Sequence, residues 1–435
     1  MSHRFVAEAP GRLDVMGGIS DYSGGLVLQQ VLRETTHVEF SPSTDGHCVL
    51  TSVVGEEIRH AEFGMDEVLN DGLVDYSHAA RFFKGNEESS WAAYVIGVAL
   101  VLMKEKALPF EGGAFQIRST IPPGKGVSSS AALEMATLRA LADAFRVSFV
   151  GTESAILAQM AENQVAGAAC GLMDQLATGF GRAGALLPIL CQPDILSDCV
   201  SVPEGLMFTG LDSGLRHAVG GSTYADVRCA AFMGYTLIAL ECGLSMRDLE
   251  HHRSSGARGA LPFGGYLANI PPDEFRTRWE RLLPETMTGR EFLRAAPATI
   301  DVATVVAPDT TYAVRTCARH PILERHRTHS FLQQLNSAHP DPHMLGKLMF
   351  ESHDAYTACG LGSPRTDEIV ERVRAGYTAQ IPGARISGGG SGGTVSLLAV
   401  GIDGAEAVEK LRAEMEHRFG SRLGLFVPEL SRPIS

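Results

Sequence analysis

A glycine- and serine-rich segment, residues 124–132, has the composition of a loop that binds an anion. It follows an alternating, strand-like run at residues 115–119 and precedes a helical composition at residues 131–145. Glycines let the backbone approach a ligand closely, and a helix N-terminus offers free N–H groups and the positive end of its dipole. Lys125 and the hydroxyls of residues 128–130 would add to these contacts. A plain turn that caps the helix is the alternative, and the spacing is not that of a loop ending in Gly-Lys-Ser/Thr.

Two carboxylates further along the chain are candidates for catalysis. Glu162 lies within an apolar, helix-like run, where an unpaired carboxylate would be costly and a bound metal ion would explain it. Asp174 follows a stretch of small residues, where the backbone can approach another group closely, and its carboxylate could accept the proton of an attacking hydroxyl. Both residues could instead be solvated surface acids, and their spacing does not separate the two interpretations.

The charge and the cysteines limit the possible partners and compartments. The formal net charge of −13 argues against nucleic acid or a membrane surface as a partner, because both require a cationic face. An anionic ligand must therefore be held locally, by backbone N–H groups, a few cations and a metal. The eight cysteines are scattered without a CxxC pair, which indicates free thiols in a reducing compartment. Without an apolar signal core or a membrane-spanning run, we expect a cytoplasmic protein.

The elements that must position these residues are predicted by composition and periodicity. A chain of 435 residues is typical of two domains, and the change in pattern near Pro203 predicts domains at 1–205 and 206–435. The segment 251–265, rich in Arg, His, Ser and Gly, is predicted to be a loop. Strands are expected at 4–9, 26–40, 115–119 and 206–211, and helices at 91–106, 131–145, 152–168, 222–243, 366–380 and 404–417.

Three motifs occur in the chain in the same order as in a known protein family. They are Pro10-Gly11-Arg12 with Asp21-Tyr22-Ser23-Gly24-Gly25, Pro-x-Gly-x-Gly-x-Ser-Ser-Ser-Ala-Ala from Pro122, and the glycine motif at residues 388–393. Together they cover nearly the whole chain and resemble the GHMP kinase superfamily. The first motif and the Met-Asp-Gln sequence at 173–175 resemble its galactokinase branch. Longer segments are similar to the kinase domain of L-arabinokinases, at residues 9–23, 191–193, 212–221, 266–272, 352–353 and 358–363.

The resemblance implies an α+β fold of two lobes, an N-terminal and a C-terminal domain, with the active site in the cleft between them. It implies Asp174 as the catalytic base and Arg12 as its partner, which would also neutralise charge on the transferring phosphoryl group. ATP and Mg²⁺ are the implied cofactors and a small monosaccharide the implied partner. Magnesium would be held by Ser130 and Glu162, and the sugar by Gly18, Ile19, Asp21, Gly171 and Tyr224. The ATP-binding positions would be Pro123, Gly124, Lys125, Gly126, Val127, Ser128, Ser129, Ser130, Ala131, Gly389 and Gly390.

The first motif departs from the galactokinase pattern at two positions. Galactokinases have Glu-His, which reach the 6-hydroxyl of galactose, where this chain has Gly18-Ile19. L-Arabinopyranose has the ring hydroxyls of galactose but lacks the C6 hydroxymethyl group. The departure therefore implies an ATP-dependent kinase that phosphorylates the anomeric hydroxyl of L-arabinose. A galactose O6 against Ile19 would lose hydrogen bonds worth roughly 1–3 kcal/mol, although apolar sites reject an added hydroxyl poorly.

Other interpretations stay open. Another loop could supply the O6 contacts, which would make galactose the substrate, and a cationic segment such as residues 251–253 could accommodate galacturonate. A sensor that binds sugar and ATP without catalysis is the alternative from another class. His217 and His353 are interpreted as structural residues, and the segment 319–324 resembles a family segment to which no chemistry is assigned.

Overall fold

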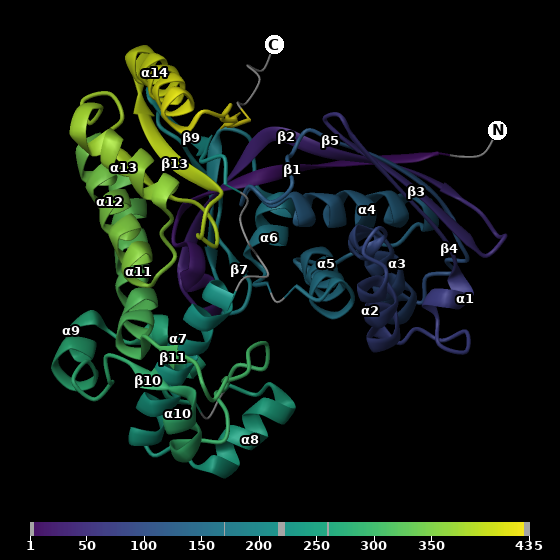
Figure 1. The fold of residues 1–435 in the computed structure, drawn as a ribbon, viewed down its shortest axis with the longest axis horizontal. Helices are drawn as coiled ribbons and strands as arrows, with labels where there is room; N and C mark the ends of the chain where they lie inside the picture. Colours follow the sequence, from purple (N-terminus) through teal and green to yellow (C-terminus); the bar gives the residue numbers. More distant parts are fainter. Residues whose placement is uncertain (1–3, 169, 216–221, 259–260, 430–435) are drawn as a thin grey trace. The chain divides into compact units, whose positions relative to one another are not determined.

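A computed structural model describes residues 4–168, 170–215, 222–258 and 261–429 of the chain. The chain forms two compact units (Figure 1). Unit 1 consists of Met1–Arg12, Gln30–Gly184 and Val427–Ser435, and unit 2 of Leu13–Gln29 and Ala185–Phe426. The N-terminal strand and its successor thus contribute residues to both units. The domain boundary expected near residue 205 stays a prediction, while the main division between the units falls after Gly184.

Unit 1 is built on a mixed sheet. Its strands are β1 (Phe5–Met16), β2 (Leu26–Pro42), β3 (His47–Val54), β4 (Glu57–Gly64) and β5 (Gly113–Ser119). They follow the order β4-β3-β5-β2, with β1 paired to β2. The β3–β5 pair is parallel, whereas β2–β5 and β3–β4 are antiparallel. Side chains alternate along these strands, as in the buried and exposed pattern of β5, so one face of the sheet is apolar.

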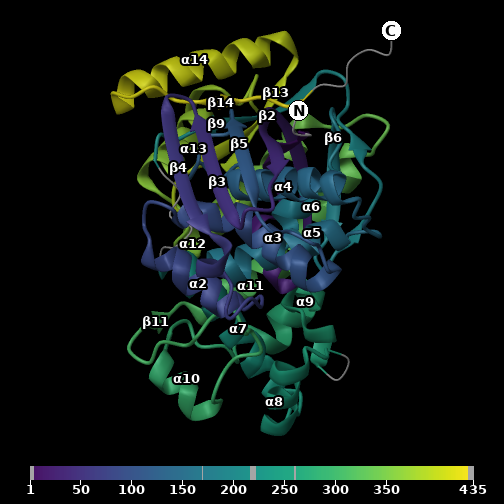
Figure 2. The ribbon, with the colours of Figure 1, turned by 90° about the vertical axis from the view of Figure 1, so that its right-hand side faces the viewer.

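Helices cover that apolar face (Figure 2). They are α1 (Met65–Val68), α2 (Tyr76–Gly85), α3 (Ala93–Lys106), α4 (Ser129–Phe145), α5 (Glu153–Ala161) and α6 (Met173–Phe180). Helix α3 is apolar on all sides because it packs against α2, α4 and α5. Phe40 and Phe115, whose ring centroids lie 4.7 Å apart, anchor the core beneath them. This core holds α4, and α6 packs against α4 and α5. The starts of α4 and α6 carry the candidate site residues of the unit.

Unit 2 contains an antiparallel sheet in the order β12-β13-β9-β14. Its strands are β9 (Leu206–Asp212), β12 (Gly383–Ile386), β13 (Thr394–Val400) and β14 (Leu425–Phe426). Helices α12 (Pro342–Ala358), α13 (Pro364–Gly376) and α14 (Gly401–Phe419) pack against these strands. Leu211, Val373, Leu397 and Leu411 are among the residues that this packing buries completely. The strands β6 (Ala185–Leu190), β7 (Ile195–Leu196) and β8 (Val200–Ser201) precede this sheet in the chain.

The rest of unit 2 is mainly helical. Helices α7 (Ser222–Glu241) and α11 (Val314–Leu335) pack against each other, and α11 also packs against α12. Shorter elements complete the unit: α8 (Met246–Ser255), α9 (Pro272–Glu274), α10 (Gly289–Ala295), β10 (Met287–Thr288) and β11 (Thr311–Tyr312). Trp279, Phe275 and Phe292 lie in the shared core of α7 and its neighbours.

The prediction of a loop over residues 251–265 is wrong for its first five residues, which belong to helix α8. Ser245 and Asp248 form a capping box at the start of this helix, and Gly256 ends it in the left-handed conformation. Leu249 and His252 are buried on one side of it. Capping and packing therefore override a composition that disfavours a helix.

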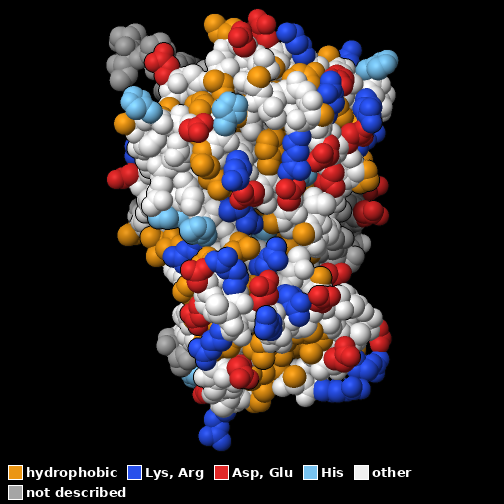
Figure 3. Space-filling model, turned by 90° about the vertical axis from the view of Figure 1, so that its left-hand side faces the viewer, with side chains coloured by type: hydrophobic (Ala, Val, Ile, Leu, Met, Phe, Trp, Pro, Cys, Tyr) orange, Lys and Arg blue, Asp and Glu red, His pale blue; other side chains and the backbone are white. Residues whose placement is uncertain are grey.

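The surface, the thiols and the helices add three observations. On the face shown in Figure 3, cationic and anionic side chains are interspersed, and ion pairs such as Arg374 with Asp354 at 2.7 Å join α13 to α12. All eight cysteines are free thiols. Among the described residues, no helix is long and apolar enough to cross a bilayer. The cytoplasmic location stays a prediction.

Candidate active site

The loop between β5 and α4 has the conformation that close approach of an anion requires. Gly124, Gly126 and Ser128 have φ angles of 72°, 71° and 60°, and helix α4 begins at Ser129 directly after them. The helix N-terminus carries free N–H groups and the positive end of the dipole. The Ser128 hydroxyl is buried and has no hydrogen-bond partner among the described residues. The predicted ATP-binding residues Pro123, Lys125, Val127, Ser129, Ser130 and Ala131 all lie on this loop or in the first turn of α4.

Strand β1 packs closely against this loop. The backbone N–H of Arg12 donates to the Val127 carbonyl oxygen at 3.1 Å, and the Arg12 Nη1 donates to the Gly126 carbonyl oxygen at 2.6 Å. A Cβ atom on Gly11 would lie only 2.9 Å from the Val127 oxygen. Glycine at position 11 is therefore what permits the approach, and the loop is fixed to the strand that carries Arg12.

Arg12 and Asp174 form the ion pair that the sequence predicted. Arg12 Nε and Nη2 lie 2.9 and 2.8 Å from Asp174 Oδ1. The arginine side chain is only 4% exposed, whereas that of Asp174, in the first turn of α6, is 24% exposed. The carboxylate is therefore held by a buried cation yet remains accessible to a substrate. The role of Asp174 as catalytic base and that of Arg12 as its partner remain proposals.

A second acidic cluster lies beside Asp174 in unit 1. The Gln175 amide nitrogen Nε2 donates to Glu162 Oε2 at 2.6 Å and to Glu134 Oε2 at 3.0 Å. Burial raises the pKa of Glu162 to about 6; the charge of Asp174 also raises it, whereas hydrogen bonds from Cys170, Ser130 and Gln175 lower it. Burial, reinforced by the charge of Glu162, raises the pKa of Glu134 well above its usual range.

Glu162 and Ser130 have the chemistry of a magnesium site. The Glu162 carboxylate and the Ser130 hydroxyl are hydrogen-bonded to each other and supply the oxygen ligands that Mg²⁺ prefers. A buried carboxylate with a raised pKa lacks charge compensation, which a cation would provide. The described residues contain no group of three or more His, Cys, Asp or Glu side chains placed to hold a metal. Mg²⁺ bound with substrate phosphates needs only one or two protein carboxylates.

The segment Gly18–Ser23 contains three of the predicted sugar contacts, and we call it the sugar signature; it lies in unit 2. Residues Gly18–Ser23 form a buried 3₁₀ turn directly after β1. Asp21 accepts the Tyr22 N–H at 2.6 Å, and the Tyr22 ring lies edge-on to Tyr224 of α7 with their centroids 6.2 Å apart. The structure thus brings the predicted residues Asp21 and Tyr224 to the same tyrosine, Tyr22. Gly171, the remaining predicted sugar contact, lies three residues before Asp174 in unit 1.

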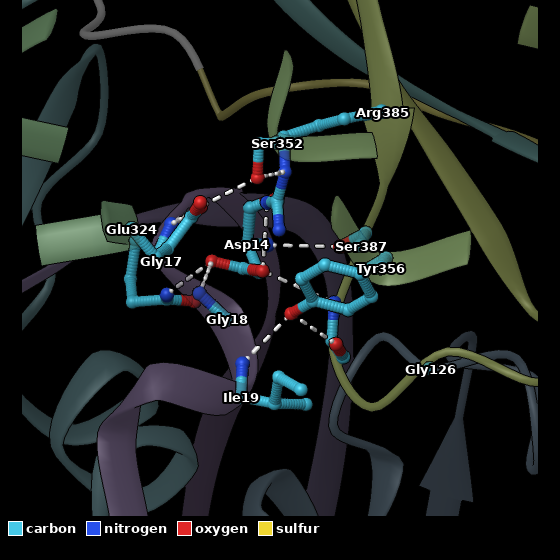
Figure 4. A network of polar contacts seen from close by, with 12 residues as sticks. Asp14, Gly17, Gly18, Ile19, Gly126, Glu324, Ser352, Tyr356, Arg385 and Ser387 are labelled. Carbon is cyan, nitrogen blue, oxygen red and sulfur yellow. Dashed lines mark hydrogen bonds and ion pairs between the residues drawn. The ribbon is translucent and has the colours of Figure 1, made fainter. Parts of the chain in front are cut away.

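The turn that carries Gly18 and Ile19 is held by a buried polar network (Figure 4). Asp14 accepts the Gly18 N–H at 3.2 Å and pairs with Arg385 Nη1 at 2.8 Å, with both side chains fully buried. Glu324 of α11 accepts the Gly17 N–H at 3.3 Å. Although burial lowers the pKa of Arg385, nearby negative groups, Asp14 foremost, raise it by more. The segment 319–324, which had no assigned chemistry, therefore supports the sugar signature through Glu324.

The third glycine motif belongs to the same network. Gly388 donates its N–H to Asp14 Oδ2 at 3.2 Å, and the Ser387 hydroxyl accepts the Asp14 N–H at 3.0 Å. A Cβ on Gly390 would lie 2.8 Å from the Leu361 carbonyl oxygen, so the motif packs tightly against the segment after α12. Gly389 and Gly390, predicted to bind ATP, are thus fixed relative to the sugar signature within unit 2.

Sequence reasoning missed several residues of these clusters. Glu134 lies in an Ala- and Leu-rich helix, the same signal that singled out Glu162. Arg385 is a charged residue in an otherwise apolar strand. Asp14, Ser352 and Tyr356 lie in or near segments quoted for the resemblance, but nothing local indicated that they meet. His353 is buried, as a structural residue would be, and His217 lies outside the described residues.

His320 offers a test of this network by pH. Its ring lies edge-on to Tyr356, with centroids 5.2 Å apart, and neither ring nitrogen has a hydrogen-bond partner among the described residues. Burial lowers its pKa to about 4. The unfolded chain therefore binds a proton that the folded chain does not, so stability should fall as the pH drops from about 6.5 towards 4.

The measurement is the urea midpoint of unfolding at pH 7.5 and pH 5. His320→Gln should be less stable at both values but lose less between them than the wild type does, with His353 supplying part of the remaining slope. The exposed His343→Gln is the control and should keep the wild-type slope. An unchanged slope in His320→Gln would contradict the buried, neutral state of this ring.

Models of known protein families match three parts of the chain. The GHMP kinases N terminal domain model matches residues 93–182, the GHMP kinases C terminal model matches residues 331–420, and the galactokinase galactose-binding signature matches residues 1–42. An L-arabinokinase of Arabidopsis thaliana is 36% identical over 97% of this chain and 45% of its own length. A galactokinase of Chloroflexus aurantiacus is 30% identical over 96% of this chain and 89% of its own.

Solved structures share the fold. Lactococcus lactis galactokinase complexed with galactose superposes with a TM-score of 0.74 at 20% identity, covering 98% of this chain and 94% of that one. The chain belongs to the GHMP kinases, whose N- and C-terminal domains it carries. Within them it is a sugar kinase of the galactokinase and L-arabinokinase type. It spans less than half the length of the Arabidopsis relative and nearly all of the bacterial one.

Proposed function

We propose that this chain transfers the γ-phosphoryl group of ATP to the anomeric hydroxyl of L-arabinose. The observation that carries the choice of sugar is the absence of a polar side chain at Gly18 and Ile19, within a signature that otherwise matches galactokinases. The similarity to an L-arabinokinase over nearly the whole chain supports it. The products are the sugar 1-phosphate and ADP.

The chemical step follows from the residues of unit 1. Asp174 accepts the proton of the anomeric hydroxyl as its oxygen attacks the γ-phosphorus. The bond from that oxygen to phosphorus forms while the bond from phosphorus to the β-phosphate oxygen breaks, and ADP leaves with the electron pair. Arg12, which lies against Asp174, orients the carboxylate and neutralises charge that develops on the transferring group.

The loop 124–128 and the start of α4 hold the phosphates. Their N–H groups bind the phosphate oxygens without requiring a net positive protein, which reconciles an anionic substrate with a charge of −13. Glu162 and Ser130 would hold Mg²⁺, which neutralises charge on the β- and γ-phosphates when bound. Gln175 keeps the Glu162 carboxylate in one orientation.

Specificity is assigned to the sugar signature. Ile19 is 2% exposed and its side chain belongs to the apolar core of unit 2, so it offers no hydrogen bond to a C6 hydroxyl. Asp21 and Tyr224 contact the ring hydroxyls that arabinose and galactose share. Galactose should therefore retain some activity, because apolar sites reject an added hydroxyl poorly.

The test is ADP release with ATP and Mg²⁺ over L-arabinose, D-galactose, D-galacturonate, D-glucose and L-fucose. We expect kcat/KM for L-arabinose to exceed that for D-galactose by about 5–150-fold. If galactose or galacturonate were preferred, the proposed mechanism would stand, but L-arabinose would be rejected as the substrate. Tight sugar binding without ADP release would favour the sensor instead.

A further inference from the structure

The hydroxyl of Tyr356, on helix α12, occupies the space beside Gly18 (Figure 4). A Cβ atom on Gly18 would lie 1.5 Å from the Tyr356 hydroxyl oxygen and 2.7 Å from its Cζ. The same hydroxyl accepts the Ile19 N–H at 2.7 Å and donates to the Gly388 carbonyl oxygen at 3.0 Å. One phenol therefore contacts both residues at which the chain departs from the galactokinase signature.

The surroundings fix the phenol in this position. Tyr356 is fully buried, its ring lies 5.1 Å from the Arg385 guanidinium carbon, and His320 packs against it edge-on. Burial raises the pKa of its hydroxyl well above the usual value, so the group is a neutral donor and acceptor. A ring packed on several sides cannot move aside cheaply to admit a side chain at position 18.

We propose that Tyr356 is a specificity-determining, positioning residue of the sugar site, which replaces by its hydroxyl the polar side chain that position 18 has in galactokinases. It acts through Gly18 and Ile19: it excludes a side chain at the first and occupies the backbone N–H of the second. The turn is thereby fixed in a form that leaves no room for a polar side chain at position 18. The inference rests on the proposed function, because it gives a structural basis for a preference for a sugar that lacks a hydroxymethyl group.

A double-mutant cycle tests the packing part. The four proteins are the wild type, Gly18→Ala, Tyr356→Leu and the double variant, and the readout is the urea midpoint of unfolding. Gly18 has a φ of 43°, which strains any side chain, but this strain is present in both backgrounds and cancels in the cycle. Gly18→Ala should lower the midpoint much more in the wild-type background than in the Tyr356→Leu background. Equal losses in the two backgrounds would overturn the proposal.

Tyr356→Phe tests the specificity part, because it keeps the ring and removes the hydroxyl that holds the Ile19 N–H and fixes the turn. The ratio of kcat/KM for L-arabinose to that for D-galactose should fall by about 3–10-fold, through a lower KM for galactose at an unchanged kcat. Tyr235→Phe is the matched control, since it removes an equally buried hydroxyl that donates to the Pro262 carbonyl at 2.7 Å, elsewhere in unit 2. An unchanged ratio in Tyr356→Phe, or an equal change in Tyr235→Phe, would overturn the proposal.

A readout without turnover separates this inference from the proposed function. Each sugar that binds the folded chain should raise the unfolding midpoint, and the shift should be larger for the sugar with the higher affinity. Tyr356→Phe should increase the shift given by galactose relative to that given by arabinose. A wild type that prefers galactose, or turns over no sugar, would reject the proposed function. The direction of this relative shift would still decide the role of Tyr356.

Discussion

Asp174→Asn is expected to lower kcat for ADP release by about 10²–10⁴-fold while the chain stays folded. Asparagine keeps the shape of the side chain but cannot accept the proton of the attacking hydroxyl. Arg12 would retain a carbonyl oxygen as acceptor in place of Asp174 Oδ1, so the local geometry should persist. Coupled ADP release under saturating L-arabinose and ATP measures the effect.

The matched control for this variant is Asp143→Asn, an exposed carboxylate on α4 in the same unit. It should turn over as the wild type does. Asp143→Asn should unfold at a midpoint near that of the wild type. Asp174→Asn should stay folded but unfold at a lower midpoint, because the buried Arg12 guanidinium then lacks its counter-charge. Wild-type turnover by Asp174→Asn would show that another group accepts the proton.

Arg385→Met should destabilise the chain by about 3–5 kcal/mol, because it leaves a buried carboxylate without its cation. Arg385 Nη1 lies 2.8 Å from Asp14 Oδ2, both side chains are fully buried, and Arg385 Nε also donates to Ser352 Oγ at 3.1 Å. Urea unfolding at pH 7 measures the loss. The double variant Asp14→Asn with Arg385→Met should recover part of it, since no lone charge then remains buried at this pair.

The control for the ion pair is Arg290→Met. Arg290 pairs with Asp309 at the surface, with side chains 62% and 86% exposed, and such pairs contribute little in water. The urea midpoint of Arg290→Met should stay close to that of the wild type. If Arg385→Met were equally mild, the Asp14–Arg385 pair would not hold the sugar signature in place.

The sequence predicted the regular elements well where the signal is local. The apolar run that became α3 and the Ala- and Leu-rich run that became α4 carry their own helical composition. Residues 152–168 were predicted as one helix, but α5 ends at Ala161 and a π-helical turn, Glu162–Ala166, follows. Periodicity does not reveal such a change in winding, which lies at a candidate metal ligand.

The candidate site was predicted where a motif is contiguous and missed where distant residues meet. The loop before α4 and the Arg12–Asp174 pair were both predicted from the motifs and their resemblance. Asp14 and Arg385 are 371 residues apart, and Ile19 and Tyr356 are 337 apart. Contacts at such separations are set by the packing of whole elements, and no local pattern in one sequence identifies them.

The buried turn Gly18–Ser23 has a thermodynamic consequence. Three backbone N–H groups at its start already donate hydrogen bonds. The Gly17 N–H donates to Glu324, the Gly18 N–H to Asp14 and the Ile19 N–H to Tyr356. The turn is therefore preorganised, and little conformational entropy would be lost in ordering it on binding of a ligand. If the turn binds the sugar as proposed, discrimination between sugars would depend on complementarity to a rigid surface rather than on a loop that closes over the correct ligand.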